Sequence, residues 1–169
     1  LDIATDPSTG ELYTLSGTGG TAGPTYFDGT NIKVYNSTTH GYFRGFPLSA
    51  YKAGNIAING SYDIYTIDVN YSVVRRYDSF GQYWNQQIGP SNAIPGLDID
   101  ASNKIYLNSL DGIQVFDSNR NFLAQIVMPE DFAFMEIAAA KDGNKVYISN
   151  WSTVRIYGPA QTNINGTVK

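Results

Sequence analysis

Short apolar runs separated by polar turns follow one another along the whole chain, most clearly between residues 96 and 123. Four runs there are rich in β-branched and aromatic residues, and the gaps between them are rich in Asn, Asp, Ser and Gly. Runs of this kind predict β-strands, and such short turns predict antiparallel hairpins. The stretch therefore predicts a four-stranded antiparallel meander, and no segment of the chain shows a convincing helical period.

The meander repeats along the sequence. The tyrosines that mark the second predicted strand of each unit are Tyr13, Tyr65, Tyr106 and Tyr147. The aromatic residues that end the third strand are Tyr35, Tyr77, Phe116 and Tyr157. Successive spacings are 52, 41 and 41 residues for the first set, and 42, 39 and 41 for the second. Repeats of about 41 residues lie in the range of propeller blades. They predict units at about 1–50, 51–92, 93–130 and 131–169.

The middle strands are apolar on successive residues, which is expected of sheets that are covered on both faces. Each blade of a propeller is covered in this way by its two neighbours, whereas the strands of a sandwich alternate more regularly. We therefore predict an all-β fold, a single β-propeller-like domain of four-stranded antiparallel blades. Its four blades would form either a small closed ring or an open segment of a larger array. The outer strand of the fourth unit could come only from 163–168.

Three segments resemble NHL-type and YVTN-type β-propeller repeats. They are Lys-Ile-Tyr-Leu-Asn at 104–108, Gly-Ile-Gln-Val-Phe-Asp at 112–117 and Lys-Val-Tyr-Ile-Ser-Asn at 145–150. The resemblance covers essentially the whole chain as architecture and implies the propeller fold. Such families usually close rings of six or seven blades, whereas this chain carries four units.

The composition excludes several classes of function. Charged residues make up 15% of the chain, against about 25% in typical globular proteins. With a net charge of −4 and no basic stripe, the chain is a poor partner for nucleic acids. The one basic doublet, Arg75-Arg76, is interpreted as a solvated strand end. There is no cysteine for a disulfide or thiolate site, and no apolar run approaches the length of a membrane span. Without an initiator Met, the sequence is expected to be a processed chain or a piece of a longer one.

Five Asn-x-Ser/Thr sequons make the chain a candidate glycoprotein. The acceptor residues are Asn36, Asn59, Asn70, Asn150 and Asn165. The first four fall in predicted turns, where a glycan would stand clear of the fold. The alternative is that turns are rich in Asn, Ser and Thr, so that sequons collect there without a role.

Acidic residues recur on the predicted first strands. We align Asp2, Ala57, Asp98 and Glu136 as equivalent positions, three of them acidic. The first strand of a blade is innermost, so these carboxylates could bind Ca²⁺ near an axis or simply line a wet channel. Asp98 and Asp100 share a strand face and form a carboxylate pair, which is weak support for acid–base catalysis.

The sequence argues against an enzyme. His40 is the only histidine, and it is expected to be exposed in a turn. No serine has the surroundings of a catalytic nucleophile, and no glycine-rich phosphate-binding motif is present. Propeller lyases similar to NHL proteins use several histidines, so their chemistry is not carried over.

Aromatic residues away from the repeat positions are candidates for contacts with sugars or proteins. They are Tyr26, Phe27, Trp84 and Trp151. A Gly- and Thr-rich insertion precedes Tyr26, and loop insertions in repeats are often functional.

We therefore predict a non-enzymatic extracellular structural or interaction protein, a glycosylated surface or filament-forming subunit that self-associates. The first alternative is a module that binds glycans or proteins through the 16–30 loop. The second is a lyase or hydrolase on a propeller scaffold.

Overall fold

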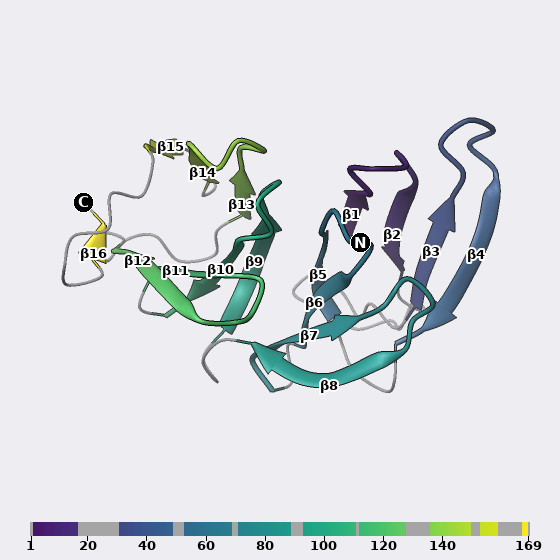
Figure 1. The fold of residues 1–169 in the computed structure, drawn as a ribbon, viewed down its shortest axis with the longest axis horizontal. Coiled ribbons are helices and arrows are strands. Elements are labelled where there is room, and N and C mark those ends of the chain that lie inside the picture. The colour runs from purple at the N-terminus through teal and green to yellow at the C-terminus, as the bar shows by residue number, and fades with distance from the viewer. Residues whose placement is uncertain are drawn as a thin grey trace. The chain divides into compact units, whose positions relative to one another are not determined.

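The computed structural model shows an all-β protein, as predicted from the sequence. It describes residues 2–16, 31–48, 53–68, 71–88, 93–110, 112–127, 136–149, 153–158 and 167–168. These residues form antiparallel meanders of the kind found in propeller blades, and they include no helix (Figure 1). It follows that no helix in the described part could cross a membrane. The chain divides into two compact units, residues 1–87 and 88–169.

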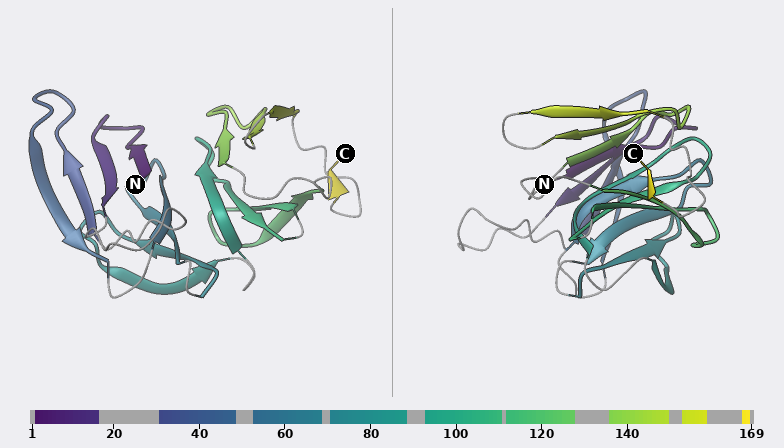
Figure 2. Two further views of the ribbon diagram at one scale, coloured as in Figure 1. Left: turned by 180° about the vertical axis from the view of Figure 1, so that it is seen from behind. Right: turned by 90° about the vertical axis from the view of Figure 1, so that its left-hand side faces the viewer.

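The first unit holds two four-stranded sheets, each with its strands in sequence order. Blade 1 consists of β1 (Asp2–Thr5), β2 (Leu12–Ser16), β3 (Asn31–Tyr35) and β4 (Tyr42–Pro47). Blade 2 consists of β5 (Ala53–Ile58), β6 (Ile64–Asp68), β7 (Val73–Tyr77) and β8 (Tyr83–Ile88). The two sheets pack through their first strands, β1 against β5. Figure 2 shows the ribbon from two further sides.

The second unit repeats this plan with a change at its end. Blade 3 consists of β9 (Ala93–Ile99), β10 (Ile105–Ser109), β11 (Gly112–Phe116) and β12 (Phe122–Ile126). Blade 4 consists of β13 (Glu136–Ala139), β14 (Val146–Ser149) and β15 (Val154–Tyr157). As in the first unit, the first strands β9 and β13 pack together.

The sequence predicts that the outer strand of blade 4 comes from residues 163–168, and the described part of this segment shows that this prediction is wrong. Thr167–Val168 forms β16, which pairs in parallel with β12 and so extends blade 3. Among the described strands, β15 therefore pairs in its sheet with β14 and forms the edge. A strand of two residues is too short for the repeat pattern to predict which strand it pairs with.

The periodic tyrosines are core residues, as predicted, in the first three blades. Tyr13, Tyr65 and Tyr106 expose at most 2% of their surface, while Tyr147 is half-buried. One apolar cluster joins blade 1 to blade 2, and a second joins blade 3 to blade 4. The continuous apolar runs of the middle strands therefore reflect sheets that are covered by a neighbouring blade.

The hairpin turns are closed by Asp or Asn side chains at repeating positions. The side-chain oxygen of each accepts backbone N–H groups two to four residues later, in an Asx turn. The residues that do so between neighbouring strands are Asp6, Asn36, Asn59, Asp78, Asp100 and Asp117. The same turns need one residue in the left-handed region, taken by Gly81 with φ of 82° or by His40 with φ of 55°. His40 is exposed there, as predicted.

Candidate functional site

Two aspartates on first strands hydrogen-bond to the neighbouring blade. Asp2 on β1 accepts the backbone N–H of Ile56 on β5 at 2.9 Å. Asp98 on β9 accepts the backbone N–H of Ala139 on β13 at 2.7 Å. In each case the other carboxylate oxygen accepts the N–H of the next residue on the aspartate's own strand. These carboxylates therefore fix one blade to the next within each unit.

The strand register corrects the alignment of acidic positions made from the sequence. Asp98 lies opposite Tyr106, as Ala57 lies opposite Tyr65, so these two positions are equivalent. Asp2 instead lies opposite Leu15, two positions beyond the repeat tyrosine of its blade. Glu136 lies opposite Ser149, which is shifted by two in the same way. The four residues thus do not form one equivalent set. The described residues bring no three Asp, Glu or His side chains together as a metal site.

The carboxylate pair Asp98 and Asp100 is engaged in structural hydrogen bonds. Asp100 is buried and accepts the backbone N–H groups of Ser102 and Lys104 through Oδ1. Its Oδ2 accepts the hydroxyl of Tyr106 at 3.1 Å. Burial raises the pKa of the Tyr106 phenol well above its ordinary value, and the neighbouring Asp100 carboxylate raises it further. The phenol therefore stays protonated as a donor to Asp100.

The interpretation of Arg75-Arg76 as a solvated strand end is wrong. Arg75 exposes 6% of its surface, and its Nε lies 2.6 Å from Oδ2 of the buried Asp68. The Nη2 of Arg76 lies 2.7 Å from Oδ2 of Asp63. Buried guanidinium groups require such partners, because an unpaired charge loses its hydration without compensation. Asp68 is the last residue of β6 and Asp63 directly precedes this strand, and the sequence pattern did not predict that these aspartates pair with the arginines of β7.

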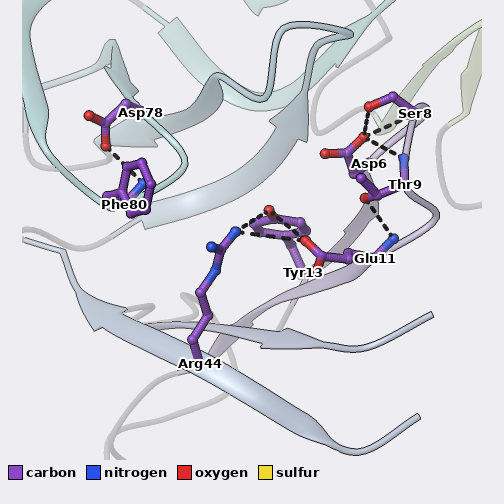
Figure 3. Close-up of polar contacts among 8 residues, drawn as sticks. All are labelled: Asp6, Ser8, Thr9, Glu11, Tyr13, Arg44, Asp78 and Phe80. Carbon is purple, nitrogen blue, oxygen red and sulfur yellow. Dashed lines mark hydrogen bonds and ion pairs between the residues drawn. The ribbon is translucent and has the colours of Figure 1, made fainter. Parts of the chain in front are cut away.

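Arg44 is the centre of a polar and aromatic contact in the first unit (Figure 3). Its Nη2 donates to the Tyr13 hydroxyl at 3.0 Å and lies 3.7 Å from the Glu11 carboxylate. The guanidinium carbon also lies 5.4 Å from the centre of the Phe43 ring and 6.0 Å from that of Phe80. Cation–π attraction at these distances holds exposed rings near a charge that is already fixed. We call Phe43, Arg44 and Phe80 the Arg44 aromatic contact.

The exposed rings lie on outer strands and turns of the first unit. Phe43 exposes 56% of its surface, Phe80 79% and Trp84 45%. The Arg76 guanidinium carbon lies 4.6 Å from the Trp84 ring centre, so Trp84 is positioned by an arginine as well. Sequence reasoning named Trp84 but missed Phe43 and Phe80. Phe80 could have been found from its place inside the polar turn Asp78-Ser79-Phe80-Gly81, where a large apolar side chain has no sheet to cover it.

The remaining aromatic candidates, Tyr26, Phe27 and Trp151, lie outside the described residues, as does most of the 16–30 loop.

The two sequon asparagines in the described part differ sharply. Asn36 is partly exposed, and its Oδ1 accepts the N–H groups of Thr38 and Thr39. Asn59 exposes 5% of its surface, and its Nδ2, the atom that a glycan would occupy, donates to Asp63 at 3.0 Å. A glycan on Asn59 would displace that bond and open a buried turn. The other sequon asparagines lie outside the described residues: Asn70, Asn150 and Asn165.

Three solved structures share the fold. A functionally unknown protein from Desulfotomaculum acetoxidans is 20% identical, with a TM-score of 0.65 over 99% of this chain and 53% of that chain. Hydrazine synthase from Kuenenia stuttgartiensis is 14% identical, with a TM-score of 0.65 over 99% of this chain and 47% of that chain. A chain of a nidogen–laminin complex is 12% identical, with a TM-score of 0.69 over 95% of this chain and 61% of that chain.

These likenesses define the class of fold, a β-propeller, and at such low identity they show the fold alone. The chain spans roughly half the length of the first two solved chains and 61% of the third. No protein-family model matches the sequence, and no curated protein sequence matches it.

Proposed function

We propose that the chain is a non-enzymatic, extracellular structural or interaction protein, a glycosylated surface or filament-forming subunit built from NHL- and YVTN-like units. One observation carries the binding role. The Arg44 aromatic contact and Trp84 present large rings to solvent at 45–79% exposure, each beside a fixed guanidinium group. Aromatic and arginine side chains are enriched at protein interfaces. The carboxylates of Asp2, Asp98 and Asp100, by contrast, serve the fold.

Sedimentation of the native protein tests the self-association that this role includes. Wild-type protein is expected to associate as its concentration rises, and a Phe43→Ala/Phe80→Ala variant is expected to lose part of that association. Both rings are more than half exposed, so their removal should leave the folded units intact. Leu110→Ala is the matched control, because Leu110 is an exposed apolar residue at 75% in the other unit. A bare protein that stays monomeric at all concentrations would contradict the proposal.

Glycosylation, the second part of the proposal, has a residue-level test. If the chain is exported through a glycosylating compartment, the folded protein should carry a glycan on Asn36 and none on Asn59. The reason is that the Asn59 amide nitrogen is buried and donates to Asp63, whereas Asn36 is partly exposed and its side-chain oxygen makes the hydrogen bonds that close its turn. Mass spectrometry of glycopeptides from secreted protein measures both sites. Asn36→Gln should remove one glycan mass, and a glycan found on Asn59 in folded protein would refute the assignment.

A second candidate function is the binding of glycans or proteins by the 16–30 loop with Tyr26 and Phe27. The described observation that favours it is Trp84, an exposed indole of the type that stacks on sugar rings. Binding to a panel of immobilised oligosaccharides should fall in Trp84→Ala and in a chain that lacks residues 17–29. Unchanged binding in both variants would count against this candidate. No described contact favours a lyase or hydrolase.

A further inference from the structure

Blades inside each unit pack by one rule, which is clearest at the contact between blades 1 and 2. One face of blade 1 contributes apolar side chains of β2 and β3 to the contact, among them Tyr13 and Val34. The facing surface of blade 2 contributes side chains of β5 and β6, among them Ile56 and Ile64. We call the first surface the leading face of a blade and the second the trailing face. Directly opposite residues in antiparallel strands lie on the same face, so the register places each residue on one of the two.

The contact between blades 3 and 4 obeys the same rule. The leading face of blade 3 includes Tyr106 and, opposite it, Val115. The trailing face of blade 4 includes Ile137 and, opposite it, Ile148. All four side chains expose at most 7% of their surface. Both contacts within the units are therefore made between a leading face and a trailing face.

In the described part of the second unit, the leading face of blade 4 has exposed apolar side chains. Ile156 lies opposite Tyr147 on this face, as Val34 lies opposite Tyr13 in blade 1. Val34 is fully buried, yet Ile156 exposes 61% of its surface and its neighbour Val154 exposes 65%. Two β-branched side chains thus stand in solvent at positions that are core in blades 1 and 3.

In the described part of the first unit, the trailing face of blade 1 also has an exposed apolar side chain. Ile3 lies opposite Thr14, as Ile56 lies opposite Thr66 in blade 2 and Ile137 lies opposite Ile148 in blade 4. Ile56 and Ile137 expose 4% and 7% of their surface, whereas Ile3 exposes 61%. The described part of the chain therefore has one exposed trailing-face isoleucine and one exposed leading-face pair.

We propose that the leading face of blade 4 in one molecule packs on the trailing face of blade 1 in a second copy of this chain. The argument is continuity, since both contacts inside the units join these two kinds of face and bury the same types of side chain. The inference rests on the self-association in the proposed function. It names the two faces that would meet and the direction in which one copy follows another. Because the two faces differ, the contact is heterologous, and its repetition adds copies head to tail.

Cross-linking tests the polarity of the contact. The sequence has no cysteine, so an introduced cysteine is the only thiol that the reagent can modify. Ile3→Cys and Ile156→Cys are prepared as separate variants and treated with a short bismaleimide, singly and mixed. Cross-linked dimers should form in the mixture and not in either variant alone. Thr38→Cys, in the exposed β3–β4 turn, is the control for random collision. Dimers from a single variant, or none from the mixture, would overturn the inference.

The doubly substituted chain, Ile3→Cys/Ile156→Cys, separates assembly between copies from closure within one chain. A ladder of dimers, trimers and longer products supports head-to-tail assembly. A cross-linked monomer would mean that the two faces meet in the same molecule, and would refute the inference.

Sedimentation of Ile156→Asp gives a second measurement. The variant should fold normally, because residue 156 is exposed, and should weaken association by about 30-fold or more, the effect of burying an unpaired charge. Leu110→Asp is the matched control and should leave association unchanged. If wild-type association persists in Ile156→Asp and falls in the Phe43/Phe80 variant, the head-to-tail contact is wrong and the proposed function stands. If wild-type protein does not associate at all, both fail.

Discussion

Removal of the Asp98 carboxylate should loosen the contact between blades 3 and 4. Its Oδ2 accepts the N–H of Ala139 at 2.7 Å across the blade boundary, and its Oδ1 accepts the N–H of Ile99 at 2.8 Å. A hydrogen bond to a charged group contributes about 1.5–3 kcal/mol. The carboxylate is half-buried and water can replace the local bond to Ile99, so we expect Asp98→Ala to cost about 2 kcal/mol, chiefly through Ala139.

Urea unfolding followed by circular dichroism measures this loss, and hydrogen exchange of the Ala139 amide locates it. Asp98→Asn keeps one acceptor oxygen and should lose about half as much stability. Asp142→Ala removes an exposed carboxylate that accepts the N–H of Asn144 inside its own turn, so it controls for the change in net charge and for the loss of a local hydrogen bond. If Asp98→Ala is as stable as Asp142→Ala, or the Ala139 amide exchanges at the wild-type rate, the carboxylate does not hold the blades together.

Two further predictions concern the turns. Gly81→Ala should destabilise the first unit by about 2 kcal/mol or more, since φ is 82° and an added Cβ would overlap the ring of Phe46. Gly60→Ala, with open space around it, should stay within about 0.5 kcal/mol in the same urea titration. Hydrogen bonds from the Asn121 side chain and backbone lower the pKa of Asp117, so its stabilising effect is present above the ordinary pKa of 3.8 and lost as pH falls through the lowered value. Asp117→Asn keeps the acceptor without the titration, so its melting temperature should fall less between about pH 7 and pH 3; an equal fall would refute the role of Asp117.

The strands and the repeat were predictable because they depend on local pattern. The spacing of Tyr13, Tyr65 and Tyr106 marks the second strand of three blades, and each of these side chains is buried. The Asx turns were visible as polar clusters between apolar runs. Asn36 and Asn59 look alike in the sequence, however, and only their surroundings separate a partly exposed amide from a buried, bonded one.

Register and partner choice were not predictable. Asp2 and Asp98 each stand between a leucine and an isoleucine, so the sequence predicts that they are equivalent. The hairpin register instead places their positions in the repeat two residues apart. A shift of two residues keeps every side chain on its face, so the apolar pattern cannot detect it. Arg75 looked solvated because its partner Asp68 lies seven residues away on another strand.

The secondary structure, the repeat and the class of fold follow from local sequence, since the strand period, the turn residues and the aromatic spacing all lie within a repeat of about 41 residues. Which face of a blade is covered depends on the packing of one blade on another, which the local pattern does not contain. Val34 and Ile156 occupy equivalent positions in the repeat, and one is fully buried while the other exposes 61% of its surface. Burial depends on whether a neighbouring blade packs on that face. Equivalent positions carry similar apolar residues in either case, so the residue type does not reveal whether it is covered.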